Sequence, residues 1–195
     1  TGHTGFKGSW LSLWLQNLGA EVVGVSLDPP SKINLYTQAN VSKGMISLRE
    51  DIRNRNAIKK LFQEHKPEIV FHLASLFVSE HKKVDIDRLI NSNLLFGTQL
   101  LEAMRENGVK KIVNTGTSWQ HYNSENYNPV NLYAATKQAF EDMLRFYIEA
   151  YDMQAITLKL FDTYGPNDNR KKIIHLLMEA ARTGKVLEMS PGEQV

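Results

Sequence analysis

The sequence contains no cysteine, which excludes disulfide bonds, thiolate catalysis and cysteine-ligated zinc sites. Its six histidines lack the spacing of known zinc-binding motifs, so no metal site is expected. No apolar run reaches the roughly 20 residues needed to cross a bilayer. No secretion signal is visible at its beginning, and the expectation is a cytoplasmic protein.

An excess of charge of one sign is also missing. Lysine and arginine number 23 against 21 aspartates and glutamates, which leaves a net charge of +2. This balance gives no reason to expect a nucleic acid or an anionic membrane as partner. With 195 residues, of which 42% are hydrophobic and 23% charged, the composition is typical of a globular domain with a substantial core.

Short apolar strands alternate with helices along the chain. The pattern predicts helices at 9–18, 54–65, 86–107, 133–150 and 171–183. It predicts strands at 21–27, 45–48, 68–74, 110–118 and 155–161. Strands that alternate with helices indicate βαβ units, and we therefore expect a doubly wound α/β domain around a parallel sheet.

Three glycines, Gly2, Gly5 and Gly8, stand at regular spacing before the first predicted helix. In a doubly wound sheet the first strand-to-helix turn binds phosphate, because glycines let the backbone approach a pyrophosphate at a helix N-terminus. A plain turn is the alternative, but it does not account for three glycines in register with a helix start. Since such a turn follows a strand and none precedes Thr1, we expect an internal fragment that lacks its first strand and a C-terminal part.

Several short motifs occur together in one order. They are TGHTGF at 1–6, DIR at 51–53, FHLAS at 71–75, NLLFGT at 93–98, TGTS at 115–118, YAATK at 133–137 and LFDTYGP at 160–166. In these motifs the chain resembles the extended short-chain dehydrogenases/reductases, the NAD-dependent epimerase/dehydratase family that acts on nucleotide sugars. The resemblance implies a Rossmann-type domain over 1–195, with only part of the substrate lobe present after about residue 165. It also implies a nicotinamide cofactor, a nucleotide-sugar substrate, a homodimer and a role in polysaccharide biosynthesis.

The resemblance implies a catalytic pair, Tyr133 and Lys137, four residues apart on a helix. At this spacing both side chains lie on one face, and the ammonium is expected to lower the pKa of the tyrosine. Thr117, at the end of the preceding strand, is expected to hydrogen-bond the sugar, with Ser118 as the neighbouring alternative. The structural alternative for Tyr133 and Lys137 is an ordinary pair on a helix surface, and the alternative for Thr117 is an ordinary turn residue.

Cofactor-binding residues are also implied by the resemblance. Besides Tyr133 and Lys137 they are Gly2, Thr4, Gly5, Phe6, Ser26, Asp51, Ile52, Leu73, Ala74, Ser75, Asn93 and Thr115. The spacing from Asn93 to Gly97 is one residue longer than in many relatives. Ser26 stands where NAD enzymes usually have an acidic residue. Its small hydroxyl admits a 2′-phosphate, with Lys32 as counter-charge, which favours NADP(H). NAD(H) is the alternative, with Asp28 reaching the ribose.

Two reactions compete in the sequence. The N-terminal stretch resembles CDP-glucose 4,6-dehydratases, whereas the second half resembles synthases of CDP-linked dideoxyhexoses such as abequose and paratose. Dehydration needs an acid and a base beside Thr117, but Ser118 and Trp119 stand there and neither replaces a carboxylic acid. We therefore expect reduction of a 4-keto sugar nucleotide, CDP-linked. An epimerase, a CDP-glucose 4,6-dehydratase and a non-catalytic dinucleotide sensor are the alternatives.

Three further residues are expected near the substrate. Trp119 is placed at the wall of the sugar pocket, Asp162 near a sugar hydroxyl or a backbone donor, and Arg170 near the diphosphate, with a surface position as the alternative for Arg170. The resemblance also implies that helices 86–107 and 133–150 pair with a second subunit. The apolar residues of these helices fit an intrachain core equally well; they are Leu89, Leu94, Leu101, Phe140 and Leu144.

Overall fold

A computed structural model describes residues 1–51, 53–168, 170 and 172–189. Its described strands are all parallel. β1 (Val23–Ser26) pairs with β2 (Ile46–Arg49), and β3 (Ile69–His72), β4 (Lys111–Thr117) and β5 (Gln154–Leu160) form a second sheet in that order. The expected α/β fold with parallel strands is confirmed, and the parallel arrangement gathers the carboxyl ends of neighbouring strands at one edge.

The first two residues connect the two sheets. The amino group of Thr1 donates to the carbonyl oxygen of Phe71 in β3 at 2.6 Å. The next backbone N–H, that of Gly2, donates to the carbonyl oxygen of Val25 in β1 at 3.0 Å. The glycine-rich turn therefore starts between β1 and β3, at the middle of the strand array.

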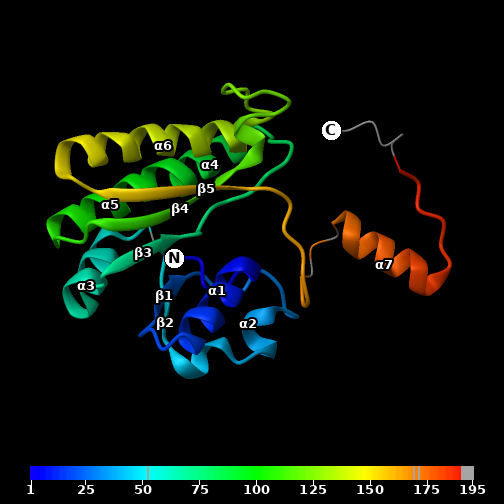
Figure 1. Ribbon diagram of the computed structural model, residues 1–195, viewed down its shortest axis with the longest axis horizontal. Helices are drawn as coiled ribbons and strands as arrows, with labels where there is room; N and C mark the ends of the chain where they lie inside the picture. The colour runs from blue at the N-terminus through cyan, green and yellow to red at the C-terminus, as the bar shows by residue number, and fades with distance from the viewer. Residues whose placement is uncertain (52, 169, 171, 190–195) are drawn as a thin grey trace.

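The predicted helices are present, with shifted ends. They are α1 (Phe6–Asn17), α3 (Arg55–His65), α6 (Leu132–Tyr151) and α7 (Ile173–Thr183), together with a long run made of α4 (Asp85–Leu89), η2 (Ile90–Leu95) and α5 (Phe96–Glu106). α6 is capped by Asn131, whose side chain accepts from the Ala134 N–H at 2.9 Å. Figure 1 shows α4, α5 and α6 lying together along β3, β4 and β5, with α7 apart from both sheets.

Two local features were not predicted. The segment between β1 and β2, for which the sequence predicted no helix, contains α2 (Leu35–Gln38), whose first turn is capped by the Asn34 side chain, and the 3₁₀ turn η1 (Val41–Gly44). The middle of the long helix is a π-helix, η2. A π segment accommodates one extra residue in a continuous helix. It lies at the place where the spacing from Asn93 to Gly97 is one residue longer than in many relatives.

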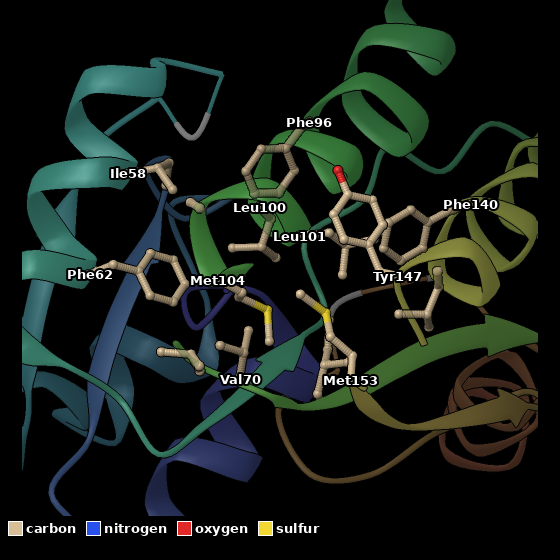
Figure 2. Close-up of a cluster of buried hydrophobic side chains, with 14 of the residues drawn as sticks. Ile58, Phe62, Val70, Phe96, Leu100, Leu101, Met104, Phe140, Tyr147 and Met153 are labelled. Atoms are coloured by element: carbon tan, nitrogen blue, oxygen red, sulfur yellow. The ribbon is translucent and has the colours of Figure 1, made fainter. Parts of the chain in front are cut away.

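The hydrophobic core lies between the helices and the sheet of β3, β4 and β5. Figure 2 shows side chains from α3, α5 and α6 meeting those of β3. The buried set is Val25, Ile58, Phe62, Val70, Phe96, Leu100, Leu101, Ala103, Met104, Val109, Ile112, Phe140, Leu144, Tyr147 and Met153. Gly97 makes the close packing of α5 on α6 possible, because a Cβ there would stand 2.5 Å from the Phe140 ring. This core fixes α6, which carries Tyr133 and Lys137, against the sheet.

Candidate active site

A cavity of about 620 Å³ opens at the carboxyl ends of the strands. This volume is within the usual range for small-molecule sites. Of the residues predicted from the sequence, those that line it are Gly2, Thr4, Gly5, Phe6, Leu73, Ser75, Thr115, Thr117, Trp119, Tyr133, Asp162 and Arg170. Segments far apart in the sequence, from the N-terminal turn to the loop after β5, therefore share one site.

The glycine turn forms one wall of the cavity and is held by close backbone packing. A Cβ at Gly8 would lie 2.1 Å from the carbonyl oxygen of Gly2, and a Cβ at Gly2 would lie 2.8 Å from the backbone nitrogen of Ala74. Gly2 also has a φ of +77°, which a side chain would strain. At Gly5, by contrast, a Cβ would meet only the Gly2 carbonyl oxygen, at 3.4 Å. The turn is thus closed on the protein side and open where Gly5 lines the cavity.

Tyr133 lies in the first turn of α6 and presents its ring to the cavity. The ring packs edge to face on Phe77, with 5.0 Å between the ring centres, and the hydroxyl shares a hydrogen bond with Ser75. Burial raises the pKa of Tyr133, and the Ser75 hydrogen bond opposes that rise only in part. The expected lowering of this pKa was therefore wrong for this structure, because burial outweighs the groups that stabilise the phenolate. The phenol is held in its protonated form.

Lys137 follows one turn later on α6 and is 3% exposed. The pKa of Lys137 is lowered from 10.5 to about 8, chiefly by burial and in addition by the charge of Lys7, while Glu141 opposes the shift. Lys137 is not among the residues that line the cavity. It lies behind Tyr133, as a buried cation on the same helix.

Thr117 ends β4 and lines the same cavity as the glycine turn. Its backbone N–H donates to the side-chain oxygen of Gln120 at 2.9 Å, and its hydroxyl accepts from the Trp119 N–H at 3.3 Å. These two bonds form a capping box around the short 3₁₀ helix η3 (Ser118–Gln120). Ser118 and Trp119 both line the cavity beside Thr117, and neither is a carboxylate.

The loop after β5 brings two predicted substrate residues to the cavity, each already in an ion pair. Arg170 donates to Asp168 at 2.6 Å and lies over the Phe6 ring at 4.9 Å. Asp162 pairs with Lys172. The aspartate is thereby balanced by a lysine of its own chain, which explains how a carboxylate is tolerated at a site expected to bind phosphate.

Five predicted residues do not line the cavity, and Ile52 lies outside the described residues. Lys137 is one of them. The Ser26 hydroxyl lies 2.7 Å from that of Thr4, so it faces the glycine turn. The Asp51 carboxylate is bound by the Arg53 guanidinium, and Ala74 packs its backbone on Gly2.

Asn93, in η2, is the fifth. Its side chain accepts from the Leu76 N–H at 2.7 Å and donates to the Leu76 carbonyl oxygen at 2.9 Å. It also donates to the Thr136 hydroxyl at 3.1 Å. Asn93 therefore fixes the loop after β3 to α6 and supports the cavity from behind.

Other lining residues were missed by the sequence analysis. They include Lys7, Pro30, Ser31, Asn34, Leu35, Phe77, Asn167, Asp168 and Lys172. Phe77 lies between Tyr133 and Trp119, with ring centres 5.0 and 5.6 Å away. No local pattern marks Phe77, because its position depends on the fold of the loop after β3. Lys7 did carry a signal, since it stands inside the glycine turn.

A glycine-rich turn at the start of a helix, parallel strands and a cavity at their carboxyl ends define an α/β nucleotide-binding protein of the Rossmann type. The model of the NAD dependent epimerase/dehydratase family matches residues 1–195. The chain belongs to this family, which is a family of enzymes. Across the described residues, no helix is long and apolar enough to cross a membrane.

Individual relatives point to several reactions. The chain is 39% identical over 115 residues to CDP-glucose 4,6-dehydratase of Salmonella typhimurium, a match that covers 58% of this chain and 32% of the relative. It is 29% identical over 132 residues to CDP-abequose synthase of Yersinia pseudotuberculosis, covering 67% of this chain and 46% of the relative.

Among solved structures, UDP-glucose 4-epimerase of Thermus thermophilus in complex with NAD superposes with a TM-score of 0.75. It is 30% identical, and the match covers 92% of this chain and 60% of that structure. The matches thus span from 32% to 60% of the length of these proteins.

Proposed function

We propose that the chain is the nucleotide-binding part of an enzyme that reduces the keto group of a 4-keto sugar nucleotide, CDP-linked, with a nicotinamide cofactor. The observation that carries the proposal is the pair Ser118 and Trp119, which lines the cavity beside Thr117. A 4,6-dehydration requires an acid and a base next to the sugar, and neither side chain exchanges a proton at neutral pH. A reduction needs only a hydride donor, one proton donor and a shaped pocket.

The residues of the cavity fit a dinucleotide. The wall around Gly5 has room that a Cβ would fill, and the turn leads directly into the N-terminus of α1, where backbone N–H groups and the helix dipole favour phosphate. Gly2, Thr4, Gly5 and Phe6 would hold the diphosphate, and Leu73, Ser75 and Thr115 would line the path to the nicotinamide. When bound, the cofactor supplies the hydride.

The chain's own residues handle the proton and the sugar. Tyr133, protonated in its buried position, donates a proton to the C4 oxygen. The Thr117 hydroxyl orients that oxygen from the opposite side, and Trp119 forms part of the wall that excludes water. Lys137 supplies positive charge behind Tyr133, which stabilises the phenolate that remains after the transfer.

For the cofactor we favour NADP(H), with NAD(H) as the alternative. Ser26 is small and turned toward Thr4, so it leaves the end of β1 without an inward acidic group. Arg49, paired with Ser26 in the register of β1 and β2, lies 3.7 Å from the carboxylate of Asp28. A 2′-phosphate would compete with Asp28 for this guanidinium, whereas the ribose hydroxyls of NAD would use Asp28 itself.

The assay supplies CDP-4-keto-6-deoxyglucose with NADPH or, separately, NADH, and follows the loss of reduced-cofactor absorbance. Oxidation of one cofactor equivalent per sugar supports the reductase and identifies the preferred cofactor. In parallel, CDP-glucose is supplied with NAD. Formation of a 4-keto product from CDP-glucose, without oxidation in the first assay, would overturn the proposal in favour of a dehydratase.

A 4-epimerase is the second candidate, favoured by the similarity to the Thermus thermophilus enzyme over 92% of this chain. An epimerase uses the same tyrosine, but returns the hydride to the other face of the sugar. Interconversion of UDP-glucose and UDP-galactose without net cofactor oxidation would identify it.

We also propose a homodimer that pairs α5 and α6 across two subunits. Five apolar residues of these helices fitted either a dimer interface or an intrachain core in the sequence analysis: Leu89, Leu94, Leu101, Phe140 and Leu144. In the structure they lie in or against the core of the chain itself. Other apolar side chains of this helix layer remain exposed: Leu95, Met143 and Phe146. Replacing Phe146 by Glu should shift the protein to a monomer in sedimentation analysis, because a charge there opposes burial in an interface.

A further inference from the structure

Lys7 is a cavity residue for which the proposed mechanism has no use. It is the second residue of α1, between Gly5 and Gly8, and its side chain lines the same cavity as Tyr133. The loop after β5 closes on it from the other side, because Arg170 lies over the neighbouring Phe6 ring. Figure 1 shows the chain that leaves β5 running down beside α1 before it reaches α7.

The other cations of this cavity have protein partners. Arg170 pairs with Asp168, whose side chain is only 6% exposed, and Lys172 pairs with Asp162. Burial raises the pKa of Asp168, but the hydrogen bonds from Arg170 hold that pKa below its ordinary value. The Asp168 carboxylate is therefore ionised and already bound to Arg170. Lys7 makes no salt bridge within the described part of the chain. The lining carries three cations and two carboxylates, which leaves one positive charge in excess.

The placement of Lys7 is unfavourable in the absence of an anion. Burial lowers its pKa, Arg170 and Lys172 lower it further, and Asp162 and Asp168 oppose them only in part. The first turn of α1 holds no acidic residue, and a cation at this end of a helix is opposed by the helix dipole. A partly desolvated ammonium that neither an ion pair nor its helix stabilises would gain from a bound anion.

We propose that the Lys7 ammonium is a ligand for the diphosphate group of a nucleotide bound in this cavity. The inference rests on the proposed function, since both of its reactants carry a diphosphate. A lysine binds phosphate oxygens as a compact point charge with three donors.

The test compares Lys7→Met, which keeps the aliphatic stem, with Lys7→Arg, which keeps the charge. Lys60→Met is the matched control, because Lys60 is a helical lysine on α3 with 74% of its side chain exposed. The probes are inorganic pyrophosphate, NAD and CDP, with adenosine and cytidine as ligands without phosphate. Binding is measured by calorimetry, and thermal unfolding of each variant shows that it is folded.

Loss of one charge-assisted hydrogen bond should weaken diphosphate binding by about tenfold or more in Lys7→Met. Binding by Lys7→Arg should stay within about threefold, and Lys60→Met should match the wild type. A loss for NAD alone assigns Lys7 to the cofactor, and a loss for CDP alone assigns it to the substrate. Either outcome supports the inference.

Equal binding of all three probes by Lys7→Met and the wild type would overturn the inference, as would a wild type that binds none of them. An equal loss for adenosine and cytidine would overturn it too, because the lysine would then act on the shape of the cavity. Failure of the proposed function looks different. In that case the diphosphate probes would still bind in a way that depends on Lys7, but no sugar nucleotide would be turned over.

Discussion

The side-chain oxygen of Gln120 accepts the backbone N–H of Thr117 at 2.9 Å. The Gln120 amide nitrogen donates in turn to the side-chain oxygens of Gln138 at 2.9 Å and Glu141 at 2.7 Å. Gln120 is fully buried. One side chain thus ties the end of β4, where Thr117 meets the cavity, to α6, the helix of Tyr133.

Replacing Gln120 by Leu should therefore be costly. It leaves the Thr117 N–H without its buried partner and removes one of the groups that bind the Glu141 carboxylate, so we expect the free energy of unfolding to fall by about 2–3 kcal/mol. Urea denaturation measures this change. Gln63→Leu, at an exposed position on α3, is the control and should stay within about 0.5 kcal/mol of the wild type. Equal stability of Gln120→Leu and the wild type would contradict the role of this bond.

Replacing Tyr133 by Phe removes the proposed proton donor and keeps the ring that packs on Phe77. We expect turnover of the sugar nucleotide to fall by about a thousandfold, because general acid catalysis contributes factors of this size. Cofactor binding, measured by calorimetry, should be unchanged. Tyr127→Phe is the control, since Tyr127 is 50% exposed. Full activity of Tyr133→Phe would remove Tyr133 from the mechanism.

The lowered pKa of Lys137 predicts that the stability of the protein depends on pH. Its pKa of about 8 in the folded protein is below the ordinary 10.5, so between these values the unfolded chain holds a proton that the folded chain has released. The free energy of unfolding therefore rises with pH through this window, and the burial cost is fully present below it.

Lys137→Met should accordingly be more stable than the wild type at about pH 7, by on the order of 3 kcal/mol. The difference should disappear as the pH approaches 10.5. Chemical denaturation at about pH 7 and about pH 10 tests this, with Lys60→Met as an exposed control that shows no such trend. Activity should be lost in Lys137→Met. A stability difference independent of pH would refute the assigned pKa shift.

Gly8 and Gly5 should respond differently to the same substitution. Gly8→Ala places a Cβ 2.1 Å from the Gly2 carbonyl oxygen, so the turn must move, and we expect a loss of about 3 kcal/mol in unfolding free energy. Gly5→Ala meets nothing closer than 3.4 Å and should fold normally. It should still weaken NAD(P) binding, by about tenfold, because the methyl group enters the cavity. Normal cofactor binding by Gly5→Ala would place the dinucleotide elsewhere.

The sequence by itself determined the order of elements and the class of fold. Apolar strands of fixed length alternate with capped helices, and these local signals survive in the structure with shifts of a few residues. The Asn131 cap of α6 is an example, since a cap depends only on its own next three residues. The glycine turn was equally visible, because its spacing reflects steric limits of the backbone itself.

Only the tertiary structure decided which side chains share the cavity. Ser26 and Thr4 are 22 residues apart, and their hydrogen bond turns Ser26 away from the site expected for it. Phe77 reaches Tyr133 only because Asn93 fixes the loop after β3. The pKa of Tyr133 likewise depends on burial by residues from other segments. Burial and pairing are properties of the packed chain, so a local pattern carries no signal for them.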